Sequence, residues 1–162
     1  MLDAELIDHL ESDGTLIVGT VDRSGIPEAT YAWTFEVREP TGPDDPTTVR
    51  LLVPTTAART RANLEATGRV AATVTDVITL RSAQVKGRLV GFDDPSPADE
   101  RRAARKFDAV MSRIHETDGT AMEVLANFRP RRLFGVVISV DEVYDQTPGP
   151  VAGTRLAPSA AP

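Results

Sequence analysis

The 162-residue chain contains no cysteine, and its only histidines are His9 and His115. The absence of cysteine excludes disulfides, thiol catalysis, cysteine-ligated zinc and iron–sulfur clusters. Two histidines so far apart in the sequence are also too few for a metal cluster. We expect both to have structural or solvent-facing roles, so any demanding chemistry would need a cofactor that the chain binds.

Long apolar runs are absent too. No segment approaches the roughly 20 apolar residues of a membrane-spanning helix, and the first residues have neither the basic nor the apolar part of a signal peptide. The net charge of −6 opposes binding to nucleic acids and anionic membranes, because an acidic surface repels phosphate groups. We therefore expect a soluble, cytoplasmic protein with no nucleic-acid or membrane partner.

The composition is that of one globular domain. Hydrophobic residues make up 41% of the chain and charged residues 26%. We predict a single domain over residues 1–145. The remaining segment, residues 146–162, contains four prolines and many small residues. We expect it to form a tail that is extended or disordered at its end.

Hydrophobic patterning predicts a mainly β protein of the α+β class. Six strands are expected, over residues 15–21, 27–37, 49–53, 70–75, 82–92 and 133–144. Helices are expected over residues 2–10, 57–66 and 97–118, with a short one near 122–128. Because short loops join several neighbouring strands, the sheet should be mainly antiparallel. Six strands in so short a chain would close into a small barrel, with helices over its openings.

The segment from Arg50 to Asn63 is the first candidate site. A strand ends there, and Thr55 or Thr56 is expected to cap the helix that follows. Free backbone N–H groups, the positive end of the helix dipole and the guanidinium groups of Arg59 and Arg61 would suit one phosphate group. The alternative is a capped surface helix with ordinary arginines.

The strand over residues 82–92 is the second candidate. Its polar face carries Gln84, Lys86 and Arg88, and such a face can line a ligand cleft or simply meet solvent. The acidic pair Asp93–Asp94 follows it beside a proline, and we expect a solvated turn there rather than paired catalytic carboxylates.

Two aromatic side chains are the third candidate. Tyr31 and Trp33 fall on the apolar side of the alternating strand over residues 27–37. They would either stack on a flat cofactor or belong to the hydrophobic core.

Taken in order, these segments resemble the pyridoxamine 5′-phosphate oxidase-like family of FMN-binding split barrels. The hairpin over residues 14–27 is similar to the family's pattern of strand, Asp-x-x-Gly-x-Pro and second strand. Residues 50–70 resemble its strand followed by Thr/Ser, Lys-x-x-Asn-Leu and Arg-Val, and residues 84–90 resemble its Val-x-Gly strand. The resemblance covers roughly residues 2–145.

The resemblance implies a six-stranded antiparallel split β-barrel with flanking helices, and a homodimer with cofactor sites at the subunit interface. FMN is the implied cofactor, and the flavin would supply hydride or electron transfer in an oxidoreductase that acts on an unknown small molecule. The positions that the resemblance and the residues together assign to cofactor binding are Arg50, Thr55, Thr56, Arg59, Thr60, Arg61, Asn63, Gln84 and Lys86.

One departure from the family pattern keeps two alternatives open. The family's phosphate-binding lysine aligns with Thr60, so Arg59 or Arg61 would have to supply the charge. Some relatives bind a 5-deazaflavin coenzyme instead, which makes a deazaflavin-dependent reductase the first alternative. The second is a non-enzymatic small-barrel binding module that has lost the flavin. The longer C-terminal half of the true oxidase has no counterpart here, so we do not expect oxidation of pyridoxamine 5′-phosphate.

Overall fold

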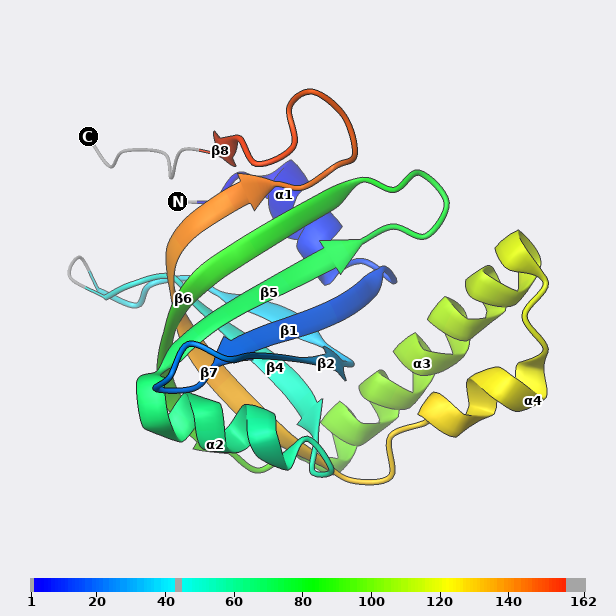
Figure 1. Ribbon diagram of the computed structural model, residues 1–162, viewed down its shortest axis with the longest axis horizontal. Coiled ribbons are helices and arrows are strands. Elements are labelled where there is room, and N and C mark those ends of the chain that lie inside the picture. Colours follow the sequence, from blue (N-terminus) through cyan, green and yellow to red (C-terminus); the bar gives the residue numbers. More distant parts are fainter. Residues whose placement is uncertain (1, 43–44, 157–162) are drawn as a thin grey trace.

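The computed structural model describes residues 2–42 and 45–156, and its centre is one antiparallel sheet of eight strands. Strands β1 to β7 follow the order β2-β1-β5-β6-β7-β4-β3, and β8 pairs with β7. The strand bounds are Thr15–Val21 (β1), Pro27–Ala32 (β2), Phe35–Arg38 (β3), Thr48–Pro54 (β4), Arg69–Thr75 (β5), Ser82–Asp93 (β6), Leu133–Asp145 (β7) and Arg155–Leu156 (β8). The expected mainly antiparallel β class with flanking helices is confirmed (Figure 1).

The strand count differs from the predicted six for two reasons. The segment expected as one strand over residues 27–37 is broken at Trp33 and Thr34 into β2 and β3, which form the two ends of the sheet. The amide of Trp33 donates to the carbonyl of Leu52 on β4, at 2.9 Å, so the chain crosses from one end of the sheet to the other at this point. The second extra strand is β8, in the proline-rich tail.

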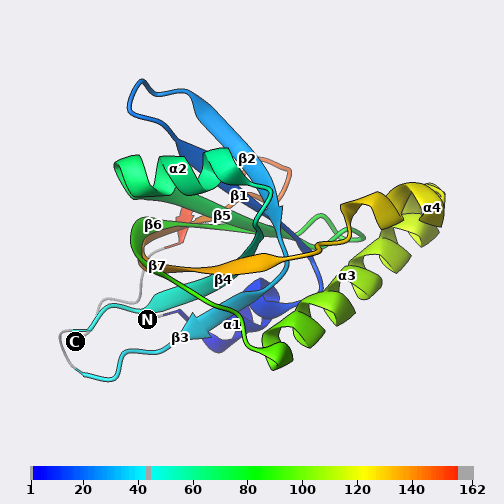
Figure 2. The same cartoon turned by 90° about the horizontal axis from the view of Figure 1, so that it is seen from below.

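Two of the helices pack against the ends of the barrel interior. These are α1 (Ala4–Glu11) and α2 (Ala58–Thr67), seen at opposite ends of the sheet in Figures 1 and 2. Leu10 of α1 and Leu64 of α2 belong to the same buried cluster as Val18, Leu51 and Val85 of the strands. The predicted opening and middle helices therefore exist, and they exclude water from the barrel interior.

The long helix α3 (Pro97–Asp118) begins as the sequence predicts. Ser96 accepts a hydrogen bond from the amide of Asp99, and the Asp99 side chain accepts one from the amide of Ser96, which together make a capping box. The helix lies outside the barrel beside α4 (Met122–Leu125) and the short 3₁₀ turn Ala126–Phe128 (Figures 1 and 2). Among the described residues, no helix has both the length and the hydrophobicity to cross a membrane.

A second, smaller apolar cluster joins α3 and α4 to the sheet. Its buried members are Trp33, Leu52, Ala103, Phe107, Val110, Met111 and Leu125. The rings of Trp33 and Phe107 lie 5.1 Å apart. Leu51 and Leu52 are consecutive on β4 and both fully buried, because one faces the barrel and the other faces α3.

Arg50 ties the barrel to the start of α3. It is only 4% exposed, and its Nε lies 2.8 Å from Asp93 Oδ2 while its Nη1 lies 3.2 Å from Asp99 Oδ1. Gly135 of β7 makes room for this contact, since a Cβ there would come within 1.7 Å of the Asp93 carboxylate. The expectation of a solvated turn is therefore wrong for Asp93, which is held by a guanidinium group from β4.

Thr55, Thr56 and Tyr31 differ from what the sequence predicts, and part of the tail pairs with the sheet. Neither Thr55 nor Thr56 caps α2, whose N-cap position is Ala57 without a side-chain hydrogen bond. Tyr31 does not join the core: it is 44% exposed, because it shares the outward face of β2 with Pro27 and Ala29. Within the tail, Arg155–Leu156 pairs with β7, and the expectation for its end falls on residues 157–162, outside the described part of the chain.

Candidate functional site

A groove of about 640 Å³ lies where β2, the turn between β4 and α2, and the segment before β7 meet. Its lining residues are Thr30, Tyr31, Trp33, Pro54, Thr55, Thr56, Asn127, Phe128, Arg129, Pro130, Arg131 and Arg132. The amide of Thr55 donates to the carbonyl of Arg132 at 3.0 Å. This bond fixes the arginine-rich segment against the two threonines.

The arginines of the groove differ in what they contact. Arg129 pairs with Asp108 of α3, and its guanidinium lies 4.3 Å from the centre of the Phe107 ring. Arg131 and Arg132 are exposed, and neither forms an ion pair within the described residues. Two unpaired guanidinium groups beside two exposed hydroxyls are suitable donors for one phosphate or carboxylate group.

Aromatic rings form the other side of the groove. Tyr31 and Trp33 stack with ring centres 6.5 Å apart and an interplanar angle of 25°. Phe128 meets Tyr31 edge-on at 5.6 Å. The groove therefore combines a flat apolar wall with donors for an anion, which suits an aromatic ring that carries a phosphate.

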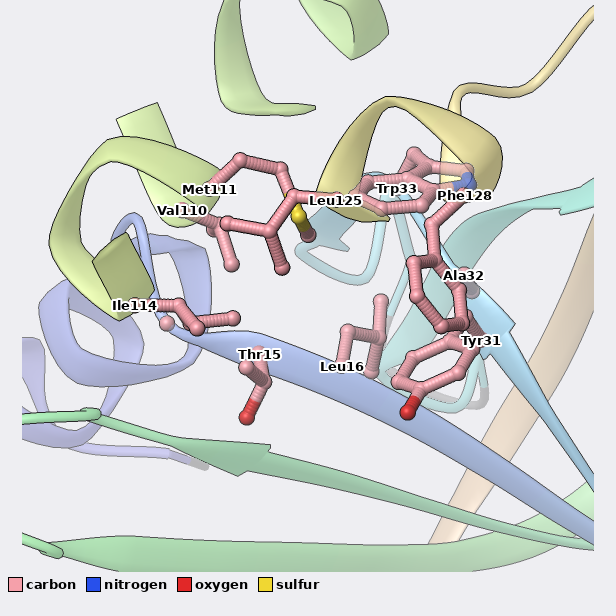
Figure 3. A pocket seen from close by; sticks show the side chains of 11 residues that line it. Thr15, Leu16, Tyr31, Ala32, Trp33, Val110, Met111, Ile114, Leu125 and Phe128 are labelled. Carbon is pink, nitrogen blue, oxygen red and sulfur yellow. The ribbon is translucent and has the colours of Figure 1, made fainter. Parts of the chain in front are cut away.

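Behind these aromatic rings lies a deeper and mostly apolar cavity of about 240 Å³ (Figure 3). It is enclosed by β1 and β2 on one side and by α3 and α4 on the other, with Val110, Met111 and Ile114 pointing into it from α3. Tyr31, Trp33 and Phe128 line both this cavity and the groove. The two spaces are therefore neighbours that share one aromatic wall.

The predicted residues of α2 do not line the groove. Arg59 is exposed, and its Nη1 lies 3.6 Å from Glu28 Oε2. Arg61 forms an ion pair with Glu65, and its guanidinium lies over the Phe92 ring. Thr60, at the position of the family's lysine, is buried, and its hydroxyl has no hydrogen-bond partner in the described structure. Since its side chain faces inward, Thr60 does not present a donor at the helix surface.

Asn63 is also buried, on the inner face of α2. Its side-chain amide donates to the hydroxyl of Thr20 on β1, at 3.2 Å. That contact holds α2 against the barrel. Of the predicted α2 region, only Thr55 and Thr56 are brought together with the aromatic pair Tyr31 and Trp33.

Lys86 lies on a different surface, across β1, β5 and β6, where an open cleft of about 850 Å³ is found. Its ammonium group lies 4.4 Å from the centre of the Tyr144 ring. Gln84, on the same strand face, donates to Thr73 at 2.9 Å. These side chains are therefore separate from the arginine groove within one chain.

Arg50 is held away from both surfaces by its carboxylate partners. Its hydrogen bonds to Asp93 raise the pKa of the guanidinium further above its ordinary range, and those to Asp99 add to this, although burial opposes it. Burial by itself would raise the pKa of Asp99, but the hydrogen bonds from Ser96, Arg102 and Arg50 outweigh it and hold that pKa well below the usual value. The positive charge of Arg50 is therefore balanced by the carboxylates of Asp93 and Asp99.

The sequence interpretation missed Arg129, Arg131 and Arg132. The signal was present as the run Arg-Pro-Arg-Arg just before the last long strand, which is the densest group of positive charge in an acidic chain. The run by itself does not indicate this site, because the pairing of β4 with β7, which brings residues 129–132 beside Thr55, joins segments far apart in the sequence.

Neither the protein-family models nor the curated proteins contain a match to this chain. Solved structures do match it. HupZ of Group A Streptococcus is 19% identical, with a TM-score of 0.52 over 94% of this chain and 100% of that one. A candidate pyridoxamine 5′-phosphate oxidase of Lactobacillus delbrueckii is 18% identical, with a TM-score of 0.52 over 88% and 93%.

An F420 reductase is also similar, at 19% identity and a TM-score of 0.50 over 88% of this chain and 98% of that one. Similarity at such low identities establishes a shared fold. It does not show that this chain binds the same ligands as those proteins. The order of the strands, the helices over the barrel ends and these matches agree with one another. The chain has the split-barrel fold of the pyridoxamine 5′-phosphate oxidase-like family.

Proposed function

We propose that this chain binds FMN in the arginine groove and acts as a flavin-dependent oxidoreductase on a small molecule. The observation that carries the proposal is the convergence of Thr55, Thr56, Arg131 and Arg132 on one groove with a stacked aromatic wall. The residues fit the cofactor, since a phosphate needs fixed donors and a flavin ring needs a flat apolar surface. When bound, a flavin supplies hydride or electron transfer.

The protein's own part is to bind and orient. Arg131 and Arg132 would donate charge-assisted hydrogen bonds to the phosphate, with the hydroxyls of Thr55 and Thr56 as further donors. The exposed ring of Tyr31, with the buried Trp33 stacked behind it, would offer the flavin an apolar surface and keep water from one of its faces. No nucleophile is required of the chain, which agrees with the absence of cysteine.

The 5-deazaflavin coenzyme is the second candidate. One of the similar structures is an F420 reductase, and the unpaired guanidinium groups of Arg131 and Arg132 would serve a phosphorylated deazaflavin equally well. We also propose that the chain forms a homodimer with the cofactor at the subunit interface, as the family resemblance implies. Light scattering of the purified protein tests the dimer, and a monomer at micromolar concentration would contradict it.

Titration of the purified protein with FMN and with the deazaflavin coenzyme tests the function. We expect FMN to bind with a dissociation constant in the micromolar range or below and to raise the melting temperature, because a ligand that binds only the folded state stabilises it. Tighter binding of the deazaflavin coenzyme would favour the second candidate. If neither cofactor binds at saturating concentration, the chain is a binding module without a flavin.

A further inference from the structure

We propose that the cavity under α3 binds an uncharged, flat aromatic molecule of one or two rings, and that this molecule is the substrate. The site is the 240 Å³ cavity of Figure 3, which the cofactor groove does not include. Its role as a substrate site rests on the proposed function. Its ability to bind an aromatic molecule does not, and can be measured without any cofactor.

The lining of the cavity excludes charge. Leu16, Ala32, Val110, Met111, Ile114 and Leu125 supply most of the wall. The hydroxyl of Thr15 points toward β5, where it donates to the carbonyl of Thr75 at 3.3 Å, and is therefore already used. The indole nitrogen of Trp33 lies at the end of its ring turned away from Val110 and Ile114 (Figure 3). A charged ligand would lose its hydration there, and none of the side chains that line the cavity carries a charge to compensate it.

Size and shape favour an aromatic ligand. An apolar cavity of about 150 Å³ remains dry and binds benzene, so 240 Å³ accommodates one ring with space for a second. Trp33 and Phe128 offer ring faces and edges for stacked or edge-on contacts. The thioether of Met111 points into the same space and makes favourable contacts with aromatic rings.

The cavity has an entrance on the side of the groove. Tyr31 and Phe128 line both spaces and are 44% and 45% exposed, whereas Val110 and Met111 at the back are almost fully buried. A ligand that entered past the edge of these two rings would pass the wall on which we place the flavin. An aromatic substrate in the cavity would then lie next to the cofactor, where it could give a hydride to the flavin or take one from it.

Trp33 gives a direct measurement, because it is the only tryptophan in the chain and lines the cavity. Nitrobenzene is uncharged, has one ring and quenches indole fluorescence. We expect saturable quenching of Trp33 in the cofactor-free protein. Ile114→Phe and Leu125→Phe, which place an extra ring in the cavity, should each weaken nitrobenzene binding at least tenfold. The matched control Ile114→Leu, which conserves volume, should stay within about twofold of the original protein.

The double variant Arg131→Ala/Arg132→Ala separates this proposal from the proposed function. It should bind nitrobenzene as the original protein does, while losing affinity for FMN. In this variant 4-nitrobenzoate, the charged analogue, should bind at least tenfold more weakly than nitrobenzene. The absence of saturable quenching would overturn the cavity proposal. So would unchanged binding in both folded phenylalanine variants, or equal binding of 4-nitrobenzoate. Failure of FMN to bind would overturn the proposed function and leave the cavity result standing.

Discussion

The two apolar regions of this molecule are built differently. The barrel interior is surrounded by one curved antiparallel sheet, whose end strands β2 and β3 do not pair with each other, and α1 and α2 cover its ends. Leu51 and Val85 within it are fully buried. The contact between the sheet and α3–α4 is enclosed by side chains alone, and next to it lies a 240 Å³ cavity. Strand pairing fixes the spacing of side chains throughout the first region, whereas in the second it acts only on the sheet side, where Leu52 lies on β4.

This difference in packing suggests that the barrel interior mainly stabilises the fold, while the α3–α4 side provides the space for ligands. A closely packed interior leaves no room for a ligand, while a helix held against a sheet by a small cluster can leave space beside it. The groove, the cavity and the aromatic wall they share all lie on the α3–α4 side. We therefore expect substitutions in the barrel to change mainly the free energy of unfolding, and substitutions on the α3–α4 side to change mainly ligand affinity.

The largest expected effect is in the barrel interior. Leu51→Ala should lower the free energy of unfolding by about 4 kcal/mol, because the paired strands cannot move to fill the space left behind. Leu125→Ala, at the edge of the existing cavity, should cost no more than about 2 kcal/mol, since part of its surface has no packing partner to lose. Urea denaturation of both variants measures the difference. Equal losses would contradict the distinction between the two regions.

The second effect concerns the ionic contact that joins the two regions. Arg50→Met should cost about 3 kcal/mol, because it leaves Asp93 and Asp99 without their guanidinium partner. The pKa of Asp99 is lowered in the folded state, so its contribution is present above the unfolded value near 4 and is lost as the pH falls further. Denaturation at pH 3 and pH 6 should therefore show a smaller pH dependence in Arg50→Met. An unchanged dependence would contradict the assignment.

The third effect has the opposite sign. Lys106 of α3 is buried, its ammonium group has no hydrogen-bond partner among the described residues, and burial lowers its pKa to about 8 although Asp13 and Glu11 oppose this. The unfolded chain then binds more protons between about pH 8 and 10.5, so stability rises with pH over that range. Lys106→Met should stabilise the protein at pH 7 by about 2 kcal/mol, and thermal melts at pH 7 and pH 10 should show the gain shrinking. Destabilisation at pH 7 would contradict it.

The smallest effect concerns the entrance to the cavity. Tyr31 and Phe128 meet edge-on at 5.6 Å and are both about half exposed. A double-mutant cycle with Tyr31→Ala and Phe128→Ala should give a coupling of about 1 kcal/mol in the free energy of unfolding. A coupling near zero would mean that the two rings do not hold the 3₁₀ turn against β2.

Local signals in the sequence predicted much of the fold. The helices expected over residues 57–66 and 97–118 and the alternating strands depend on neighbours in the chain, and the structure has each of them. The break at Trp33 was not predictable in this way, because it accompanies a hydrogen bond from the Trp33 amide to the carbonyl of Leu52, on a strand further along the chain. The paired state of Arg50 and Asp93 has the same origin, since 43 residues separate them.

The candidate site was only partly predictable for this reason. Thr55, Thr56 and Tyr31 were selected from local patterns, and they do line the groove. The arginines beside them come from the segment before β7, and their position follows from the pairing of β4 with β7. Whether the predicted Arg59, Arg61 and Lys86 also contact a cofactor stays a prediction, for which alanine variants and FMN titration are the test.

The central claim is that Arg131 and Arg132 bind the phosphate of a flavin. Riboflavin, which has the same ring without the phosphate, provides the comparison. The original protein should bind FMN at least tenfold more tightly than riboflavin, since each charge-assisted hydrogen bond contributes about 1.5–3 kcal/mol. In Arg131→Ala/Arg132→Ala the preference for FMN should fall to about threefold or less, because only the hydroxyls of Thr55 and Thr56 remain as donors to the phosphate. Equal affinities in the original protein, or an undiminished preference for FMN in the double variant, would contradict the account.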